Sequence, residues 1–427
     1  MGRLPKVRVR AIQASSAREA LAAIAAQAGL RLVEIDTRHF RLEPLPAPPS
    51  LAVRDQAESP ASAAAQMQDI VVTGTKRDAY LDDLPLSVSV LSSTQFGQSA
   101  GPSGSSAVVA QVSSMTSTNM GPGRNRIFIR GVADSAFNGP TQSTIGIVFG
   151  EARVNFDTPD PDLRLIDITR VEVLKGPQGA LYGSGVLGGV YRIVPNSPES
   201  RSASATISGG IGMTAHGGLN SAIDGVVNIP LTDDFATRAV AYIDTNSGWI
   251  DDQQRKATNV NLVRTAGGRL SSLWSRNDVQ VETMLAGQWT HAHDSQYATE
   301  EVGPFARSTR FAEPHHTTLL SGQIKISAPV GAALATLTSA YVHHDLANSF
   351  DASTAAIRMS ELPPLLYNES RGQSLVTNEM RLSNQTGRFQ WLFGINQLAA
   401  TSSLMATLTS PTRQTQISTY RKSYQEY

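Results

Sequence analysis

Ile168-Thr-Arg-Val-Glu-Val-Leu-Lys-Gly-Pro-Gln-Gly-Ala-Leu-Tyr-Gly183 is the stretch of this sequence that says most about its fold. Val171 and Val173 alternate with Glu172, as in a β-strand. The next residues, Lys175-Gly-Pro-Gln-Gly179, supply two glycines and a proline for a sharp reversal, and the glycines from 183 to 189 let the backbone pack closely. These residues predict a compact domain that is rich in loops.

Two enzyme motifs built on glycine-rich loops do not fit this stretch. A phosphate-binding loop ends in Gly-Lys followed by Ser or Thr, and residues 176–189 contain no such ending. Gly183-Ser184-Gly185 is not the Gly-x-Ser-x-Gly motif of a hydrolase. We therefore predict that the protein is not an enzyme and uses no cofactor.

Three sequence blocks in fixed order resemble the plug domain of TonB-dependent outer-membrane receptors. They are Leu84-Pro-Leu-Ser-Val-Ser-Val-Leu91, Arg126-Ile-Phe-Ile-Arg-Gly131, and the stretch quoted above followed by Gly188, Gly189 and Pro198. The resemblance implies a receptor in the outer membrane of a Gram-negative bacterium, with its N-terminal part in the periplasm. It would take up a scarce ligand, such as a ferric siderophore, without breaking bonds in it.

The resemblance also marks particular plug positions, namely Arg130, Gly131, Glu172, Lys175, Gly176 and Pro177. We expect the charged ones to hold the plug to polar groups inside a barrel, because charges in a lumen are favourable only when paired. Ordinary surface charges are the alternative. Residues 147–153 lack the Asp-Gly turn that is usual in the family, and residues 190–195 lack the commoner Asn-containing strand, so no ligand-loop residue is carried over.

The segment ahead of the plug resembles a TonB box. Residues 44–68 are rich in Pro, Ala, Ser and Gln and predict a flexible linker. The residues of the box-like patch, which opens the segment 69–77, are Asp69, Ile70, Val71, Val72 and Thr73. A β-prone peptide on a flexible tether suits capture by the sheet edge of a partner, here TonB with its inner-membrane complex. The alternative is the first strand of the next domain.

The N-terminal residues 1–43 predict a small βαββ unit. Ser16-Ala-Arg-Glu19 is a capping box that opens a helix ending at Gly29, and residues 30–35 and 39–42 read as two strands. This unit resembles the later part of the periplasmic signalling domain of some receptors. A signalling role through an inner-membrane regulator, with little or no transport, is therefore an alternative function.

Beyond residue 200 the hydrophobic period becomes two. Ile223, Val227, Ile229 and Leu231 share one face, and Ile324 alternates with Gln323. We count ten candidate strands, which begin near residues 203, 222, 235, 265, 278, 317, 333, 374, 388 and 415. Short turns alternate with long segments such as 290–316, as in an outer-membrane barrel whose apolar rows face lipid. A soluble β-sandwich is the alternative.

We therefore expect a mainly β protein: a plug at 78–200 and, at 201–427, the first part of an antiparallel transmembrane β-barrel. Residues 203–427 give ten strands at roughly 22 residues each, whereas a 22-stranded barrel would need about 500. We expect a truncated receptor and an unclosed sheet beside the plug. In a full-length version of such a receptor, Ile324→Arg on the outer face should be costly, and Gln323→Arg on the lumen side should be nearly silent.

The composition excludes several classes of protein. Lysine plus arginine (36) equal aspartate plus glutamate (36), which argues against a nucleic-acid binder. The absence of cysteine excludes disulfides, iron–sulfur clusters and thiol nucleophiles. No run of eighteen apolar residues predicts a transmembrane helix, and charged and polar residues interrupt any signal-peptide core at the N-terminus.

Six of the eight histidines come in three pairs. The candidates for an extracellular site that binds a chelated metal are His291, His293, His315 and His316, because imidazole suits borderline metals. His343 and His344 are adjacent in a predicted strand and must point to opposite faces. We expect polar surface roles for these residues and no metal centre.

Overall fold

The computed structural model describes residues 30–36, 39–44, 71–77, 79–81, 84–95, 104–134, 141–353, 364–384, 389–410 and 414–427. The chain divides into two compact units, Met1–Ala65 and Gln66–Tyr427, which we describe separately. Within the described ranges no helix has the length and the apolar character that a membrane crossing requires.

The first unit contains an antiparallel pair of strands. β1 (Leu30–Asp36) pairs with β2 (His39–Pro44), with Leu32 opposite Leu42. The last two strands of the predicted βαββ unit are therefore present. Its first strand, predicted over residues 7–10, and the helix predicted between Ser16 and Gly29 lie outside the described residues, as does the linker beyond Pro44.

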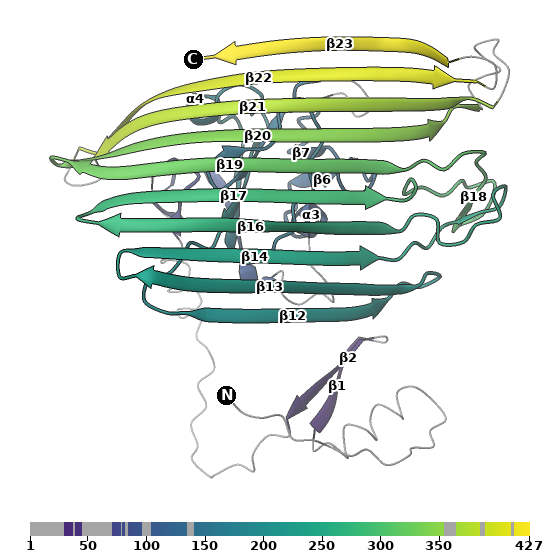
Figure 1. The fold of residues 1–427 in the computed structure, drawn as a ribbon, viewed down its shortest axis with the longest axis horizontal. Helices are drawn as coiled ribbons and strands as arrows, with labels where there is room; N and C mark the ends of the chain where they lie inside the picture. The colour runs from purple at the N-terminus through teal and green to yellow at the C-terminus, as the bar shows by residue number, and fades with distance from the viewer. Residues whose placement is uncertain are drawn as a thin grey trace. The chain divides into compact units, whose positions relative to one another are not determined.

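The second unit is dominated by one antiparallel sheet, in which ten strands are described and follow one another in sequence order (Figure 1). They are β12 (Ser204–Met213), β13 (Leu219–Thr232), β14 (Phe235–Asn246), β16 (Val263–Arg276), β17 (Val279–Ala292), β19 (His315–Val330), β20 (Ala333–Asp351), β21 (Leu366–Asn384), β22 (Trp391–Thr409) and β23 (Gln414–Glu426). All ten predicted strands are confirmed. No pairing joins β12 to β23 in the described residues, so the sheet is unclosed as expected.

The two faces of this sheet follow the period-two pattern of the sequence. The large apolar side chains of the outer face, such as Ile223, Leu285 and Phe393, are more than half exposed. The alternating side chains of the inner face are buried, for example Met284 and Val342. The predicted register is therefore correct, and Ile324 lies on the outer face while Gln323 lies on the inner one.

The strand connections differ in length between the two ends of the sheet. Residues 233–234, 277–278 and 331–332 are two-residue turns at one end, which we call the short-turn rim. Residues 247–262 and 293–314 are long connections at the opposite end, the long-loop rim. The long loops pair with each other through β15 (Asp251–Asp252) and β18 (Ala306–Arg307), which run parallel.

The predicted plug contains a five-stranded sheet in the order β5-β10-β11-β8-β9. Its strands are β5 (Ser87–Ser92), β8 (Ile145–Phe149), β9 (Ala152–Arg153), β10 (Ile168–Lys175) and β11 (Gly189–Pro195). The smaller elements are β3 (Val71–Val72), β4 (Ala79–Tyr80), the 3-10 turn η2 (Ser93–Gln95), α3 (Ser105–Gln111), β6 (Met115–Ser117), β7 (Ile127–Ile129) and α4 (Gly179–Tyr182). The stretch quoted first thus forms strand β10, which lies between β5 and β11, the reversal and α4.

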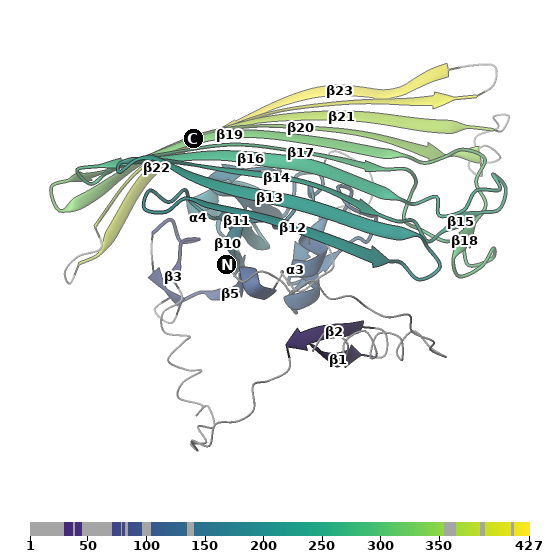
Figure 2. The same cartoon turned by 60° about the horizontal axis from the view of Figure 1, so that its bottom comes forward.

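The plug elements lie against one face of the ten-stranded sheet, as Figure 2 shows for β10, β11, α3 and α4. One apolar cluster includes Val171 and Ile193 of the plug together with Leu319, Val342 and Leu375 of the large sheet. The inner face of the large sheet is thus covered by the plug, not by a second sheet as in a β-sandwich.

Candidate functional site

Residues 71–77, the later part of the box-like segment, are docked against the plug; we call them the docked segment. Val71 and Val72 pair with Tyr80 and Ala79 in the two-stranded β3–β4 hairpin. Val72 is fully buried and Val71 is 36% exposed. Asp69 and Ile70 lie outside the described residues. The β-prone segment therefore already has a strand partner within its own chain.

Glu172 of β10 holds the docked segment in place. Its Oε1 accepts hydrogen bonds from the Thr73 backbone N–H at 3.0 Å and from the Thr73 hydroxyl at 3.2 Å. The same carboxylate pairs with Arg170 Nε at 2.7 Å, and the Arg192 guanidinium donates to the Thr73 hydroxyl. Glu172 is fully buried. Among the described residues its partners belong to the docked segment and the plug, which differs from the expected role of holding the plug to the large sheet.

Gly74 lets the docked segment approach β10 closely. A Cβ at this position would lie 2.5 Å from Cδ1 of the buried Leu174, so a side chain here would require Leu174 or the segment to shift. The Gly74 carbonyl accepts a hydrogen bond from the Tyr182 hydroxyl at 2.8 Å. The backbone of the segment is therefore held from two sides.

Lys76 connects the docked segment to the large sheet. Its Nζ lies 2.7 Å from Glu379 Oε2 on β21 and 4.5 Å from the centre of the Tyr182 ring. Both partners of the ion pair are mostly buried. The docked segment thus lies between the plug and the inner face of the large sheet.

The surroundings of the docked segment are strongly positive. Burial alone would raise the pKa of Glu151, but Arg192, Lys76, Lys325 and Arg381 together lower it to about 2. Arg192 Nη2 lies 3.0 Å from Glu151 Oε1. Glu151 therefore stays ionised and serves as a counter-charge.

The remaining predicted plug positions lie at the reversal after β10 and beside it. Gly176 takes a φ of +103° and donates its N–H to the Gly188 carbonyl at 2.9 Å, so only a glycine suits this turn. Arg130 lies beside Gly176 and is exposed, as are Gly131 and Pro177, and Lys175 ends β10. No ion pair joins Arg130 or Lys175 to the sheet within the described ranges.

Other residues hold the plug to the large sheet. Arg164 makes a bidentate contact with Asp244 of β14, at 3.0 and 3.1 Å. Asp167 pairs with Arg238 of β14 and Arg269 of β16. The sequence signal for these contacts is a charged residue at an inward-facing position of a strand whose other face is apolar.

Gln323 is a further contact between sheet and plug. Its Oε1 accepts the Glu151 backbone N–H at 2.6 Å, and its Nε2 donates to the Phe149 carbonyl at 3.1 Å. An arginine here would have no acceptor for the Glu151 N–H. The expectation that Gln323→Arg is nearly silent therefore ignored a partner that the structure supplies.

Comparison with known proteins identifies the domain. The family model described as TonB-dependent Receptor Plug Domain matches residues 81–190. These residues are a TonB-dependent receptor plug. The ferric enterobactin receptor PirA of Pseudomonas aeruginosa is 34% identical over 105 residues, which are 24% of this chain and 14% of that protein.

Solved receptors share the fold of plug and sheet together. The ferric yersiniabactin uptake receptor FyuA from Yersinia pestis matches with a TM-score of 0.63 and 17% identity, over 77% of this chain and 50% of that one. The ferric citrate transporter FecA matches with a TM-score of 0.62 and 13% identity, over 83% and 54%. The chain thus spans about half the length of these two proteins. The predicted outer-membrane location agrees with this family.

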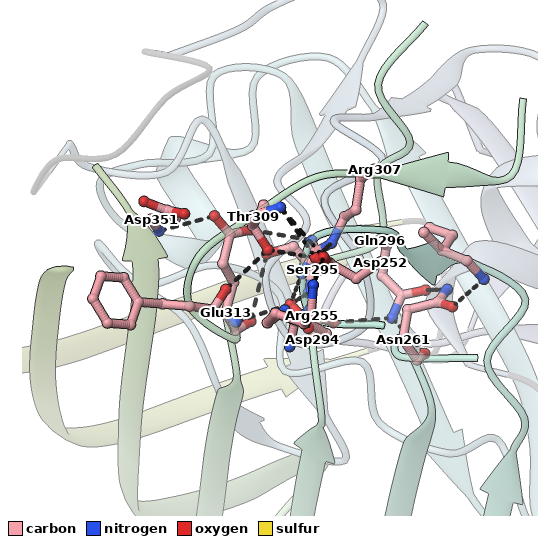
Figure 3. A network of polar contacts seen from close by, with 12 residues as sticks. Asp252, Arg255, Asn261, Asp294, Ser295, Gln296, Arg307, Thr309, Glu313 and Asp351 are labelled. Carbon is pink, nitrogen blue, oxygen red and sulfur yellow. Dashed lines mark hydrogen bonds and ion pairs between the residues drawn. The ribbon is translucent and has the colours of Figure 1, made fainter. Parts of the chain in front are cut away.

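At the long-loop rim, a buried polar network ties the loops together (Figure 3). Arg307 is fully buried and contacts three carboxylates: Asp294, Glu313 at 3.2 Å and Asp252 at 3.5 Å. Arg255 pairs with two of these acids, Asp252 and Asp294. Because breaking a buried pair leaves an uncompensated charge, this network fixes both loops.

The tip of the plug contacts the same loops. Arg124 Nη1 donates to the Ser295 hydroxyl at 3.0 Å, and Ser295 lies next to Asp294 of the network. Gly123 has a φ of +75°, and a Cβ there would lie 2.6 Å from Thr317 Cγ2. The plug therefore reaches the long-loop rim at its tip, while the docked segment lies toward the other rim.

The paired histidines divide between the two faces of the sheet. His344 is buried and lies 3.2 Å from the hydroxyl of Thr158 in the plug, whereas the neighbouring His343 lies beside Ser374 on the outer face. The rings of His291 and His316 stack at 4.0 Å, and His293 lies 4.5 Å from His291. His315 is buried on the opposite face. No group of three or more His, Cys, Asp or Glu that could hold a metal is found among the described residues.

Proposed function

We propose that the chain works in energised uptake of a scarce ligand across the outer membrane, with TonB and its inner-membrane complex as the energy source. The docked segment is the observation that supports this proposal. It is short and β-prone, and it is held on the plug by hydrogen bonds and an ion pair that could be replaced by strand pairing with TonB. A ferric chelate is the favoured ligand class, since the proteins compared above are described as handling ferric enterobactin, ferric yersiniabactin and ferric citrate.

In this mechanism TonB pairs with residues 69–73 by strand addition and pulls. Main-chain hydrogen bonds give such pairing its affinity. Freeing the segment requires Thr73 to leave Glu172 and Lys76 to leave Glu379. Because Glu172 belongs to β10, tension on Thr73 reaches the five-stranded sheet of the plug directly. No bond in the ligand is broken.

In this proposal the ligand binds at the opposite end of the plug, where its tip meets the long-loop rim. Arg124 and Gly123 contact the long-loop rim, which we place outside the cell. A ligand that binds there would act on the same domain that holds the docked segment. Lipid would contact the apolar outer face of the sheet.

The test is calorimetry of a peptide covering residues 66–78 with the C-terminal domain of a TonB protein. We expect binding by the peptide, loss of binding for Val71→Pro because proline removes a ladder donor, and weaker binding by the whole chain, in which Val72 is buried. Equal affinity of the proline peptide would refute strand pairing.

The signalling role remains a second proposal. The pair β1–β2 belongs to a unit that is separate from the rest of the chain, as a module that contacts a periplasmic regulator would be. Deleting residues 1–65 would then abolish signalling and leave ligand uptake unchanged.

A further inference from the structure

A cavity lies between the docked segment, the plug and the large sheet. Its volume is about 200 Å³, several times the roughly 30 Å³ that one molecule occupies in liquid water. Ser272 near the end of β16 and Glu282 near the start of β17 line it. The cavity is therefore on the side of the short-turn rim.

Positive charge dominates the wall of this cavity. Glu151 and Glu282 are its two acidic lining residues. The basic ones are Lys76, Arg77, Arg170, Arg192, Lys325 and Arg381. Even when the neighbouring Glu172 and Glu379 are counted, six basic side chains face four carboxylates, because Lys76 and Arg381 share Glu379, and the wall keeps a net positive charge. Cations brought together out of bulk water repel one another unless anions lie between them.

Arg77 is the basic group with the greatest capacity to bind a ligand here. It lines the cavity from the docked segment and has no ion-pair partner in the part of the chain that the structure describes. Lys325, which lines the cavity from β19 of the large sheet, is the least buried of the paired cations there and lies 2.9 Å from Glu282. A guanidinium and an ammonium that line one cavity from two different elements match the acceptor oxygens of an oxyanion.

We propose that this cavity binds a small oxyanion of the phosphate class, which bridges Arg77 of the docked segment to Lys325 of the sheet. The bound anion supplies the negative charge that the wall lacks. It therefore stabilises the docked segment, since Lys76 and Arg77 move away from the cavity when the segment is released.

The site controls how readily the segment is released. Phosphate in the periplasm would lower the fraction of chains whose segment is free for a partner strand. This consequence for TonB rests on the proposed function, whereas the anion site itself does not. Failure of the anion site and failure of the proposed function can be told apart, because the assay below tests the anion site without TonB.

The assay measures opening of the docked segment in the full chain held in detergent micelles. The protein has no cysteine, so Val72→Cys introduces a single thiol at a fully buried position of the segment. Its rate of maleimide modification reports how often the segment opens. We expect sodium phosphate to slow modification at least fivefold, with saturation, relative to sodium chloride at equal ionic strength.

Matched variants assign the effect to the cavity. The measured quantity is the rate of maleimide modification in sodium chloride divided by the rate in sodium phosphate. Arg77→Gln and Lys325→Gln should each reduce this ratio to below two. Arg276→Gln removes an exposed arginine outside the cavity and should keep the fivefold ratio. Calorimetry of the unsubstituted chain should show saturable phosphate binding. A ratio near one in the parent protein, or an unchanged ratio in Arg77→Gln, would overturn the proposal.

Discussion

Replacing Glu172 by glutamine tests whether one buried carboxylate holds the docked segment. The substitution keeps the size of the side chain and removes its charge. Glu172 accepts the Thr73 N–H at 3.0 Å and pairs with Arg170 at 2.7 Å, and it is fully buried. Glutamine can still accept one hydrogen bond from Thr73, but it leaves Arg170 without its counter-charge.

The size of the effect follows from the change in the hydrogen bond. A hydrogen bond to a charged group contributes about 1.5–3 kcal/mol, whereas one between neutral groups contributes about 0.5–1.5 kcal/mol. Glu172→Gln should therefore weaken docking by about 1–2 kcal/mol, which is a factor of roughly 5–30 in the open population.

The measurement uses two single-cysteine reporters in the cysteine-free chain. Val72→Cys reports opening of the docked segment, and Val148→Cys reports opening of the plug core, where Val148 is buried in β8. With Glu172→Gln added, we expect maleimide to modify residue 72 about 5–30 times faster, with less than a twofold change at residue 148. If the modification rates at residues 72 and 148 rise by the same factor, Glu172 stabilises the whole plug and does not hold the docked segment in particular.

Two further predictions concern the sheet and the plug interior. In liposomes, Ile324→Arg should cost about 2–4 kcal/mol near the bilayer midplane, and Gln323→Arg about 1–3 kcal/mol because the Glu151 N–H loses its acceptor; urea titration that finds Gln323→Arg silent would contradict this contact. Burial, with the nearby Asp162, raises the pKa of Asp160 to about 7, so the native state binds more protons between pH 4 and pH 7 and the free energy of unfolding falls as pH rises. Asp160→Asn should therefore stabilise the protein more at pH 8 than at pH 4, and equal stabilisation at both would refute the assignment.

The strands could be predicted from the sequence because their signal is local. Alternation of apolar and polar residues is set by the two-residue period of a strand. In the large sheet the inner face packs against the plug, and the outer face presents exposed apolar side chains. This alternation alone predicts the correct faces for Ile324 and Gln323. The partner of Gln323 could not be predicted, because Glu151 is 172 residues away in the sequence.

The contacts of the site show the same limit. Glu172 could be picked out by its motif, but its partner Thr73 lies 99 residues earlier and is uncharged, so no opposite charge suggests the pair. Arg307 carried no motif at all, and its three carboxylates come from separate positions on two loops. Such pairings depend on which loops the fold brings together, and one sequence does not encode that locally.

The two ends of the plug are held by different contacts. At the long-loop rim, Arg124 donates a hydrogen bond to Ser295, which lies next to the buried network around Arg307. At the short-turn rim, Thr73 has hydrogen bonds to Glu172, and Lys76 forms an ion pair with Glu379. If TonB pulls on the docked segment, as proposed above, the contacts of Thr73 and Lys76 bear the tension first, because these residues belong to the segment that is pulled. The contacts at the tip of the plug would then change only after β10, which carries Glu172, has been displaced.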